Sequence, residues 1–247
     1  QRALLPAQAP DRSELDAAWR FIPSEAVGGD IFDILPLGRS HLAVYMLDVS
    51  GHGIPSALVA VSVSQAMAPH GGLVLSGDVD LPLERRIRPP SVVMSRLDAL
   101  FPMERFDKYF TMFYMVLDLD TGEAAYSRAA HPPPILCRVD GECLRLEEGG
   151  SIIGLGGGQT FQEGRLRLHP GDRLFIFTDG ITEYENPDNA HYGMDRLGAA
   201  LESSAGPDME ESLDKIMDAI RLFGQGQRPK DDISLLGLAW RGQHGRG

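Results

Sequence analysis

Four aspartates stand at the ends of apolar, strand-like runs that lie far apart in the sequence. They are Asp30, Asp48, Asp179 and Asp231. Carboxylates brought to one place repel each other unless cations neutralise them, and Mg²⁺ and Mn²⁺ are hard divalent cations that prefer oxygen ligands. The pattern therefore predicts a metal site made of carboxylates, and sites of this kind commonly act on phosphate esters.

The residues around Asp48 suit a metal ligand best. Asp48 ends an apolar run and is followed by the short turn at residues 49–53, where glycine lets backbone carbonyl groups approach a cation. Asp48 is the candidate to bridge two metal ions, with the carbonyl group of Val49 as a further ligand. The alternative is that Asp48 only caps the turn before the next helix.

Asp179 and Asp231 come from two further strand ends. Asp179 follows a strongly apolar run, although an ordinary Asp-Gly turn is the alternative explanation there. Asp231 and Asp232 precede the last apolar run, and neighbouring side chains of a strand point to opposite faces. Only one of the two should therefore face the metals, and Asp231 is the candidate. Asp30 follows two glycines at the start of the first predicted hairpin, and Asp33, three residues later, is expected at the surface or in a supporting position.

Hairpins dominate the elements that must position these aspartates. Pairs of apolar runs around short turns predict three β-hairpins: residues 31–37 with 42–47, 109–119 with 123–129, and 135–138 with 142–146. Further strands are predicted at residues 165–168, 173–177 and 233–240, and helices at residues 55–67, 91–100, 193–201 and 208–223. The sequence therefore predicts an α+β fold, with helices on the outer faces of packed, largely antiparallel sheets.

Some elements carry recognisable boundary signals. Ser91 is expected to cap one helix, and the pair Asp208 and Glu211 is expected to cap another. Residues 69–90 are rich in glycine, proline and mixed charge, which predicts a loop or a mobile insertion. The glycine-rich residues 153–158 lack the lysine and the strand-then-helix context of a phosphate-binding P-loop, so a flexible loop near the site is expected.

The first 20 residues are expected to differ from the rest. This segment contains the apolar residues Leu5, Leu15 and Trp19 and is interrupted by Pro6 and Pro10. The pattern predicts the end of an upstream helix followed by a lead-in. We therefore divide the chain into residues 1–20, a linker or helix from an upstream receiver or sensor domain, and residues 21–243, the catalytic domain. The chain begins with a residue other than methionine, so we expect it to be part of a longer protein.

The composition limits the class of protein. The chain has 247 residues, 43% hydrophobic and 23% charged, with a formal net charge of -12. Such an acidic chain lacks the basic surface that neutralises nucleic-acid phosphates, and no apolar run reaches the length of a membrane span, so neither partner is expected. Cys137 and Cys143 are too few for a disulfide framework and are expected as diagonal rather than facing neighbours across a two-residue turn. This favours a reducing, cytoplasmic location.

Five segments carry a resemblance to a known family. They are residues 27–33 (Val-Gly-Gly-Asp-Ile-Phe-Asp), 48–57 (Asp-Val-Ser-Gly-His-Gly-Ile-Pro-Ser-Ala), 130–134 (Ala-His-Pro-Pro-Pro), 177–183 (Phe-Thr-Asp-Gly-Ile-Thr-Glu) and 230–234 (Lys-Asp-Asp-Ile-Ser). In this order they resemble the bacterial SpoIIE/RsbU-type phosphatases of the metal-dependent PPM (PP2C-like) serine/threonine phosphatase family, over about residues 21–240. The resemblance implies a four-layer αββα sandwich, with two antiparallel sheets flanked by helices.

The resemblance also implies a role for each aspartate. Asp48 would bridge two Mn²⁺ or Mg²⁺ ions, with the Val49 carbonyl group on one of them. Asp179 and Asp231 would bind the other ion, and Asp30 would hold the first ion directly or through water. Asp48, Asp179 and Asp231 are thus the predicted catalytic residues. Two such ions lower the pKa of a shared water, which attacks phosphorus in line with the departing serine or threonine oxygen.

The motifs leave two questions open. The family often has glycine where Ala130 stands, and Glu25 occupies the region where eukaryotic relatives carry a phosphate-binding arginine. His52 and His131 are candidate general acids. The alternative is that His52 packs in its turn and that His131 supports the proline segment that follows it.

The leading functional hypothesis is a protein serine/threonine phosphatase. The resemblance implies a phosphorylated anti-sigma-factor antagonist as substrate, in a partner-switching pathway, and a homodimer is one assembly to test. The first alternative is a catalytically silent phosphatase fold that binds or senses a partner, and loss of metal aspartates is its usual mark. The second alternative is a hydrolase for small phosphate esters, although the sequence has no signature for base stacking or ribose binding.

Overall fold

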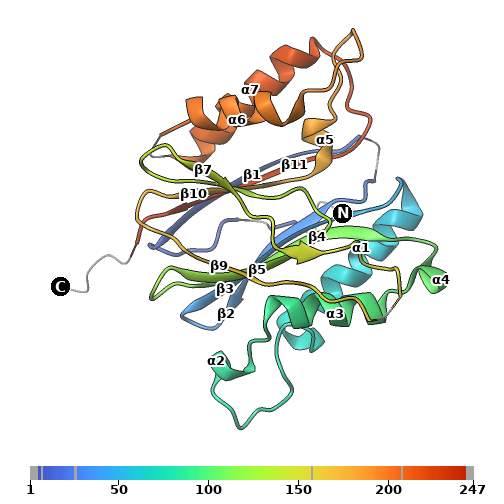
Figure 1. The fold of residues 1–247 in the computed structure, drawn as a ribbon, viewed down its shortest axis with the longest axis vertical. Coiled ribbons are helices and arrows are strands. Elements are labelled where there is room, and N and C mark those ends of the chain that lie inside the picture. Colours follow the sequence, from blue (N-terminus) through green and yellow to red (C-terminus); the bar gives the residue numbers. More distant parts are fainter. Residues whose placement is uncertain (1–4, 7, 25–26, 157, 207, 243–247) are drawn as a thin grey trace.

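The computed structural model describes residues 5–6, 8–24, 27–156, 158–206 and 208–242. The fold has four layers, in which helices cover the outer faces of two packed sheets (Figure 1). This confirms the predicted α+β class and the αββα sandwich. Within the described ranges, no helix is long and apolar enough to span a bilayer.

The first sheet, sheet A, is antiparallel and has the order β1-β11-β10-β6-β7. Its outer face is covered by helices that follow β10 in the chain (Figure 1). The side chain of Asp208 accepts a hydrogen bond from the Glu211 amide (3.3 Å), as expected for a helix cap. The strands and helices of this half are β1 (Leu15–Ile22), β6 (Ile135–Cys137), β7 (Cys143–Arg145), β10 (Arg173–Phe177), β11 (Ile233–Trp240), α5 (Asp179–Thr182), α6 (Gly193–Ser203) and α7 (Met209–Gly224).

The second sheet, sheet B, has the order β2-β3-β4-β5-β8, and β9 also pairs with β5. All its pairs are antiparallel except β5 with β8. The three predicted hairpins are all present. The elements of this half are β2 (Ile31–Leu37), β3 (His41–Val49), β4 (Phe110–Asp118), β5 (Glu123–Ala129), β8 (Gly149–Gly150), β9 (Gly164–Arg167), α1 (Ile54–Met67), α3 (Pro90–Leu100) and the short α4 (Met103–Phe106).

Alternation along the strands divides the apolar core into layers. In β3, Leu42, Val44 and Met46 pack between the sheets, whereas Ala43, Tyr45, Leu47 and Val49 pack beneath α1 and α3. In β11, Leu236 and Leu238 face sheet B, whereas Ile233 and Leu235 face α7. Successive strand residues point to opposite faces. The side-chain direction at each strand end is therefore set by the apolar residues that precede or follow it.

The prediction that residues 1–20 are the end of an upstream helix and a lead-in is wrong from Leu15 onward. Residues 15–20 belong to β1, which pairs along its full length with β11, from Leu15 opposite Trp240 to Ile22 opposite Ile233. Leu15 and Ala17 enter the core between the sheets, while Ala18 packs on the helical side. The strand period of two decides the structure here. It lets β1 bury one face between the sheets and the other on the helical side, while its backbone pairs with β11. Residues 1–4 and 7 lie outside the described part.

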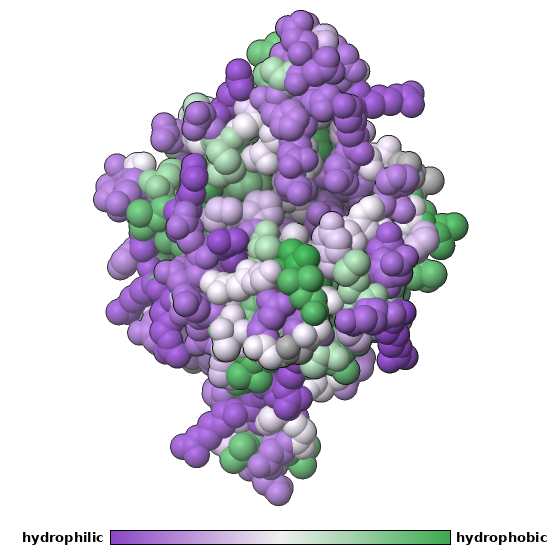
Figure 2. All heavy atoms as spheres, turned by 45° about the vertical axis from the view of Figure 1, so that its right-hand side comes forward, coloured by the Kyte–Doolittle hydropathy of each residue, from purple (hydrophilic) through white to green (hydrophobic). Residues whose placement is uncertain are grey.

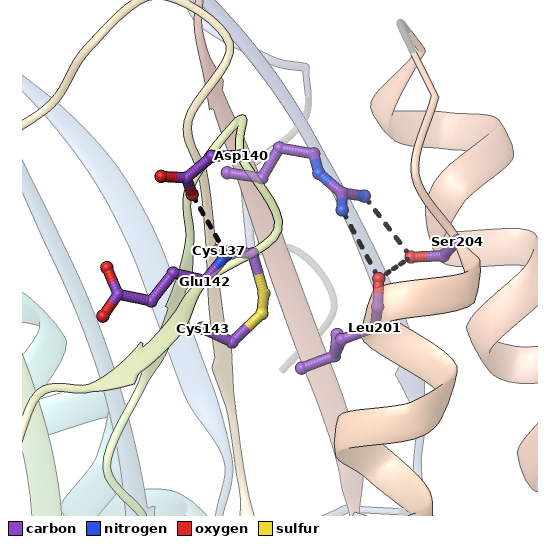
Figure 3. Close-up of a disulfide and its surroundings, with 7 residues drawn as sticks. Cys137, Asp140, Glu142, Cys143, Leu201 and Ser204 are labelled. Atoms are coloured by element: carbon purple, nitrogen blue, oxygen red, sulfur yellow. Dashed lines mark hydrogen bonds between the residues drawn. A yellow bond between two sulfur atoms is a disulfide. The ribbon is translucent and has the colours of Figure 1, made fainter.

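The two cysteines form a disulfide, which corrects the expectation based on their spacing (Figure 3). Arg138 donates a backbone hydrogen bond to the Glu142 carbonyl (2.7 Å), so the ladder extends one residue further and leaves a three-residue loop. Cys137 then lies directly opposite Cys143. Asp140 stabilises the loop by accepting a hydrogen bond from the Glu142 amide (3.1 Å). The prediction of a reducing location rests on unpaired cysteines, so the disulfide removes its support.

Residues 69–90 are more ordered than predicted. They contain a 3₁₀ turn at Pro69–Gly71 and the short helix α2 (Leu83–Arg86), and they project from the body of the molecule (Figure 1). The base of the projection is fixed, because Arg88 donates to the carbonyl groups of Gly72, Leu73 and Leu75. Ser91 is not the predicted cap, since α3 begins one residue earlier, at Pro90. Proline is favoured in the first helical turn because its missing N–H needs no partner there.

The surface is mixed rather than apolar. On the face drawn in Figure 2, hydrophilic side chains cover most of the area and hydrophobic residues form small, separate groups. Large apolar side chains such as Ile54 and Leu58 are exposed on α1. Single exposed apolar residues are normal on a folded protein and carry no functional meaning by themselves.

Candidate metal centre

Four strand ends from the two sheets meet at one end of the core between them. The alternation that buries Leu236 and Leu238 of β11 also directs Ser234 and Asp232 into this space. The same alternation in β3 places Asp48 after Val44 and Met46 on the inner face of sheet B. The polar centre therefore continues the core between the sheets beyond the point where its apolar residues end.

Asp30 is fully enclosed and receives hydrogen bonds from two hydroxyl groups. Ser234 Oγ donates to its Oδ2 at 2.6 Å, and Thr178 Oγ1 donates to the same oxygen at 2.8 Å. Burial raises the pKa of Asp30 well above its usual value, and Asp48 adds to the rise, whereas both hydroxyl groups oppose it. Asp30 therefore ties β2 to the ends of β10 and β11.

Asp232 is the second enclosed carboxylate. Its Oδ1 accepts hydrogen bonds from the amide (2.9 Å) and the hydroxyl group (3.0 Å) of Ser24, and its Oδ2 accepts from the Asp30 amide at 3.4 Å. A Cβ atom on Gly28 would lie 1.4 Å from Asp232 Oδ2, so only glycine fits beside this carboxylate. We refer to Asp30 and Asp232 as the inner pair.

Asp48 has a different environment. It is partly exposed, and its carboxylate receives no hydrogen bond from any residue within the described ranges. Burial raises the pKa of Asp48 to about 8, and the charges of Asp179 and Asp231 are the next largest causes. The three aspartates predicted to be catalytic thus lie within electrostatic reach of one another.

Asp179 and Asp231 stand nearer to solvent. Burial raises the pKa of Asp179, with Glu183 and Asp231 as further causes. Burial also raises the pKa of Asp231, although the amide of Asp232 opposes this by donating to Asp231 Oδ1 at 2.8 Å. Asp48, Asp179 and Asp231 are called the rim carboxylates below. Glu183 is a further acidic neighbour that the sequence analysis did not identify. Its position one helical turn after Asp179 was the signal that could have indicated it.

The donor chemistry fits a hard divalent cation. Carboxylates are the neighbouring groups that most affect Asp48, and the Val49 carbonyl oxygen lies 2.6 Å from the position that a Cβ atom on Gly29 would occupy. A side chain at residue 29 would therefore collide with this carbonyl group. Among the described residues, however, no three Asp, Glu, His or Cys side chains form a group that could hold an ion as they are placed. Binding would require the rim carboxylates to turn toward one another.

The two candidate general acids differ in exposure. His131 is fully buried, and burial, followed by the charge of Arg128, lowers its pKa to about 3. Its Nδ1 lies 2.8 Å from Thr111 Oγ1, and its carbonyl group accepts from Arg128 at 3.1 Å. A neutral, enclosed imidazole favours the supporting role over the acid role. His52 is exposed and lowers the pKa of Asp231, so it lies beside the rim.

Three other sequence candidates lie elsewhere or cannot be placed. Asp33 follows the alternation of Ile31 and Leu35 toward α1, so it faces away from the polar centre. Its Oδ1 accepts from the amide of Ile34 at 2.8 Å. Glu25 and Gly157 lie outside the described residues.

The family model described as Stage II sporulation protein E (SpoIIE) matches residues 38–241. Two relatives are similar over 96% of this chain: protein IcfG of Synechocystis, at 26% identity, and the phosphoserine phosphatase RsbU of Bacillus subtilis, at 25%. The chain spans 40% of the length of IcfG and 67% of the length of RsbU.

Solved structures share the fold. The SiaA-PP2C domain of Pseudomonas aeruginosa superposes with a TM-score of 0.75 at 19% identity, over 97% of this chain and 92% of that one. RsbX in complex with magnesium superposes with a TM-score of 0.64 at 14% identity, over 94% and 98% of the two chains. PstP with two manganese ions gives 0.55 at 15% identity, over 91% and 97%. The family match covers most of the sequence, so the chain belongs to the SpoIIE family of PP2C-like domains.

Proposed function

We propose that this member of the SpoIIE family is a metal-dependent protein phosphatase that hydrolyses phosphoserine or phosphothreonine. The observation that carries the proposal is the meeting of Asp48, Asp179 and Asp231 from two sheets, where their mutual repulsion contributes to raising the pKa of Asp48 to about 8. A cluster of this kind is stabilised by divalent cations, which prefer carboxylate oxygens. The similarity to RsbU, whose name describes a phosphoserine phosphatase, supports the reaction class.

Each residue has a proposed task toward two Mn²⁺ or Mg²⁺ ions. Asp48 would bridge them, the Val49 carbonyl group would bind one, and Asp179 and Asp231 would bind the other. Bound ions of this kind supply an activated water and offset the charge that develops on the phosphoryl oxygens. Asp30 already accepts two hydroxyl hydrogen bonds, so we assign it to the first ion through water rather than directly.

The proposed substrate is a phosphorylated regulatory protein of the anti-sigma-factor antagonist type, in a partner-switching pathway. The family match and the similarity to RsbU support this choice. We further propose an upstream receiver or sensor domain as the source of regulation, a cytoplasmic site of action, and homodimerisation as a way of passing the signal. Deleting residues 1–14 keeps β1 intact and should change either the activity or the oligomeric state. An unchanged protein would contradict this regulatory role.

The central test is phosphate release from a phosphoserine protein with and without Mn²⁺. We expect release to need the metal, and Asp48→Asn to lower kcat by at least about 1,000-fold because it removes the bridging carboxylate. Asp33→Asn is the matched control, since Asp33 faces away from the polar centre. Retention of activity in Asp48→Asn would overturn the assignment of the bridge. Absence of metal binding by calorimetry would favour the catalytically silent alternative.

A further inference from the structure

Lys108 lies beside the loop that follows Asp48, in the connection between α4 and β4. The neighbouring Tyr109 fixes this connection to the loop by two hydrogen bonds. Its amide donates to Ser50 Oγ at 3.2 Å, and its carbonyl group accepts from the Ser50 amide at 2.9 Å. The backbone at Lys108 is therefore attached to the segment that carries Asp48 and Val49.

The glycine-rich loop holds Lys108 from the other side. Gly154 has a φ of 115°, and a Cβ atom there would lie 3.2 Å from the Lys108 carbonyl oxygen and 3.3 Å from Tyr109 Cα. Its amide donates to Asp98 Oδ1 at 2.9 Å, and its carbonyl group accepts from the Met103 amide at 2.8 Å. Positive φ and close approach both require glycine here. Gly154 of this loop therefore packs against the backbone at Lys108.

No acidic side chain of the described residues pairs with the ammonium group of Lys108. Its Nζ lies 3.1 Å from the position that a Cβ atom on Gly51 would take, two residues beyond Val49. The other lysines of the chain, Lys215 and Lys230, form ion pairs with Glu211 and Glu185. Within the part of the chain that the structure describes, half-buried Lys108 has neither an ion pair nor a hydrogen-bond partner. The first turn of α1, which follows the loop, contains no acidic residue to neutralise it.

The net charge of the polar centre explains why a further cation is needed beside it. When ionised, the inner pair, the rim carboxylates and Glu183 carry more negative charge than two divalent cations carry positive charge. A phosphoryl dianion approaching this centre therefore needs a further cation. Arg20, the nearest arginine before Asp30 in sequence, is paired with Glu210 and Asp214 on α7.

We propose that Lys108 binds the phosphoryl group of the substrate, through an oxygen that does not face the metal ions; this rests on the proposed phosphatase function. A lysine ammonium carries three donors on a flexible stem and binds phosphate as a point charge. Lys108 is thus a substrate-binding residue that supplies positive charge from the protein, next to the negative charge of the inner pair and the rim carboxylates.

The first test measures the affinity of the Mg²⁺-loaded protein for orthophosphate by ³¹P nuclear magnetic resonance. We expect Lys108→Met to weaken binding by about ten-fold or more, because a charge-assisted hydrogen bond is lost. Lys108→Arg should stay within about three-fold of the wild type, since the charge is kept. Lys215→Met is the matched control for the change in net charge and should bind like the wild type. Equal affinities of wild type and Lys108→Met, or no binding by the wild type, would overturn the proposal.

A second set of measurements separates this role from others. Calorimetry with Mg²⁺ alone should give Lys108→Met an affinity no weaker than that of the wild type, because Lys108 does not bind the metal. KM for p-nitrophenyl phosphate and for a phosphoserine peptide should rise by similar factors. A rise for the peptide alone would place Lys108 on residues flanking the phosphoserine and overturn the phosphoryl assignment. A wild-type protein that hydrolyses neither substrate contradicts the proposed function, whatever the result with orthophosphate.

Discussion

The inner pair and the rim carboxylates lie within the same polar centre but meet different partners. Asp30 and Asp232 receive hydrogen bonds from hydroxyl and amide groups of Thr178, Ser234 and Ser24. Asp48 receives none from the described residues, and its neighbours are other carboxylates. The inner pair therefore joins strands, whereas the repulsion at Asp48 is relieved by a bound proton or a bound cation. Burial alone does not separate the inner pair from Asp48, but the supply of hydrogen-bond donors does.

The largest expected effect comes from disturbing the inner pair sterically. Gly28→Ala would place a methyl group within 1.4 Å of Asp232 Oδ2, where an enclosed carboxylate has no room to move. We expect a loss of about 3 kcal/mol in the free energy of unfolding, measured by urea denaturation.

Gly77→Ala provides the control for Gly28→Ala. A Cβ atom on Gly77 would meet nothing within 4 Å. If the two variants lost equal stability, the close contact between Gly28 and Asp232 would have no energetic weight.

Removing the charge of a rim carboxylate should instead raise the free energy of unfolding of the metal-free protein. The folded-state pKa of Asp48, about 8, lies above its unfolded value, so the metal-free folded protein binds the extra proton. The contribution of Asp48 to the stability of the metal-free protein is then greatest at low pH and falls as pH rises from about 4 to about 8. We expect metal-free Asp48→Asn to be more stable than wild type by about 2 kcal/mol at pH 8, with little difference at pH 4.

Denaturation in the presence of EDTA at both pH values measures this effect. Adding Mn²⁺ at pH 8 should raise the stability of the wild type by mass action and should leave Asp48→Asn nearly unchanged. A variant less stable than wild type at pH 8 would mean that Asp48 has favourable partners in the folded protein.

The smallest expected effect comes from removing one donor to the inner pair. Ser234→Ala deletes the hydroxyl group that donates to Asp30 Oδ2 at 2.6 Å, while Thr178 still donates to the same oxygen. We expect a loss of about 1.5 kcal/mol, because a hydrogen bond to a charged group is lost. Ser62→Ala, whose hydroxyl group donates to a helix carbonyl at the surface, should change stability by less than about 0.5 kcal/mol. Equal effects of the two serines would show that Asp30 does not depend on its donors.

Sequence patterns predicted the strand ends better than the roles of the residues on them. The alternating runs of β2 and β3 and the Asp208 cap of α7 were found because each signal is local. The choice of Asp231 over Asp232 as the metal-facing residue stays a prediction, and the partner of Asp232, Ser24, lies on a segment remote in sequence. The donors to Asp30 likewise come from β11 and the end of β10, and no local pattern indicates them.

The errors also have physical causes. β1 was missed because its strand character depends on pairing with β11, at the other end of the chain. The strand register that places Cys137 opposite Cys143 depends on one additional backbone hydrogen bond between Arg138 and Glu142. The proposed role of Lys108 could not be seen in the sequence, since it follows from the absence of a partner among the described residues and from the close approach of Gly51 and Gly154.

The position of β1 at the edge of sheet A has a practical consequence for fragment design. A truncation that starts after Ile22 would expose the backbone donors and acceptors of β11, whose side chains are almost all apolar. An uncovered apolar strand of this kind is a template for intermolecular pairing and amyloid-like growth. Recombinant versions of the domain should therefore begin before Leu15, so that β11 stays covered.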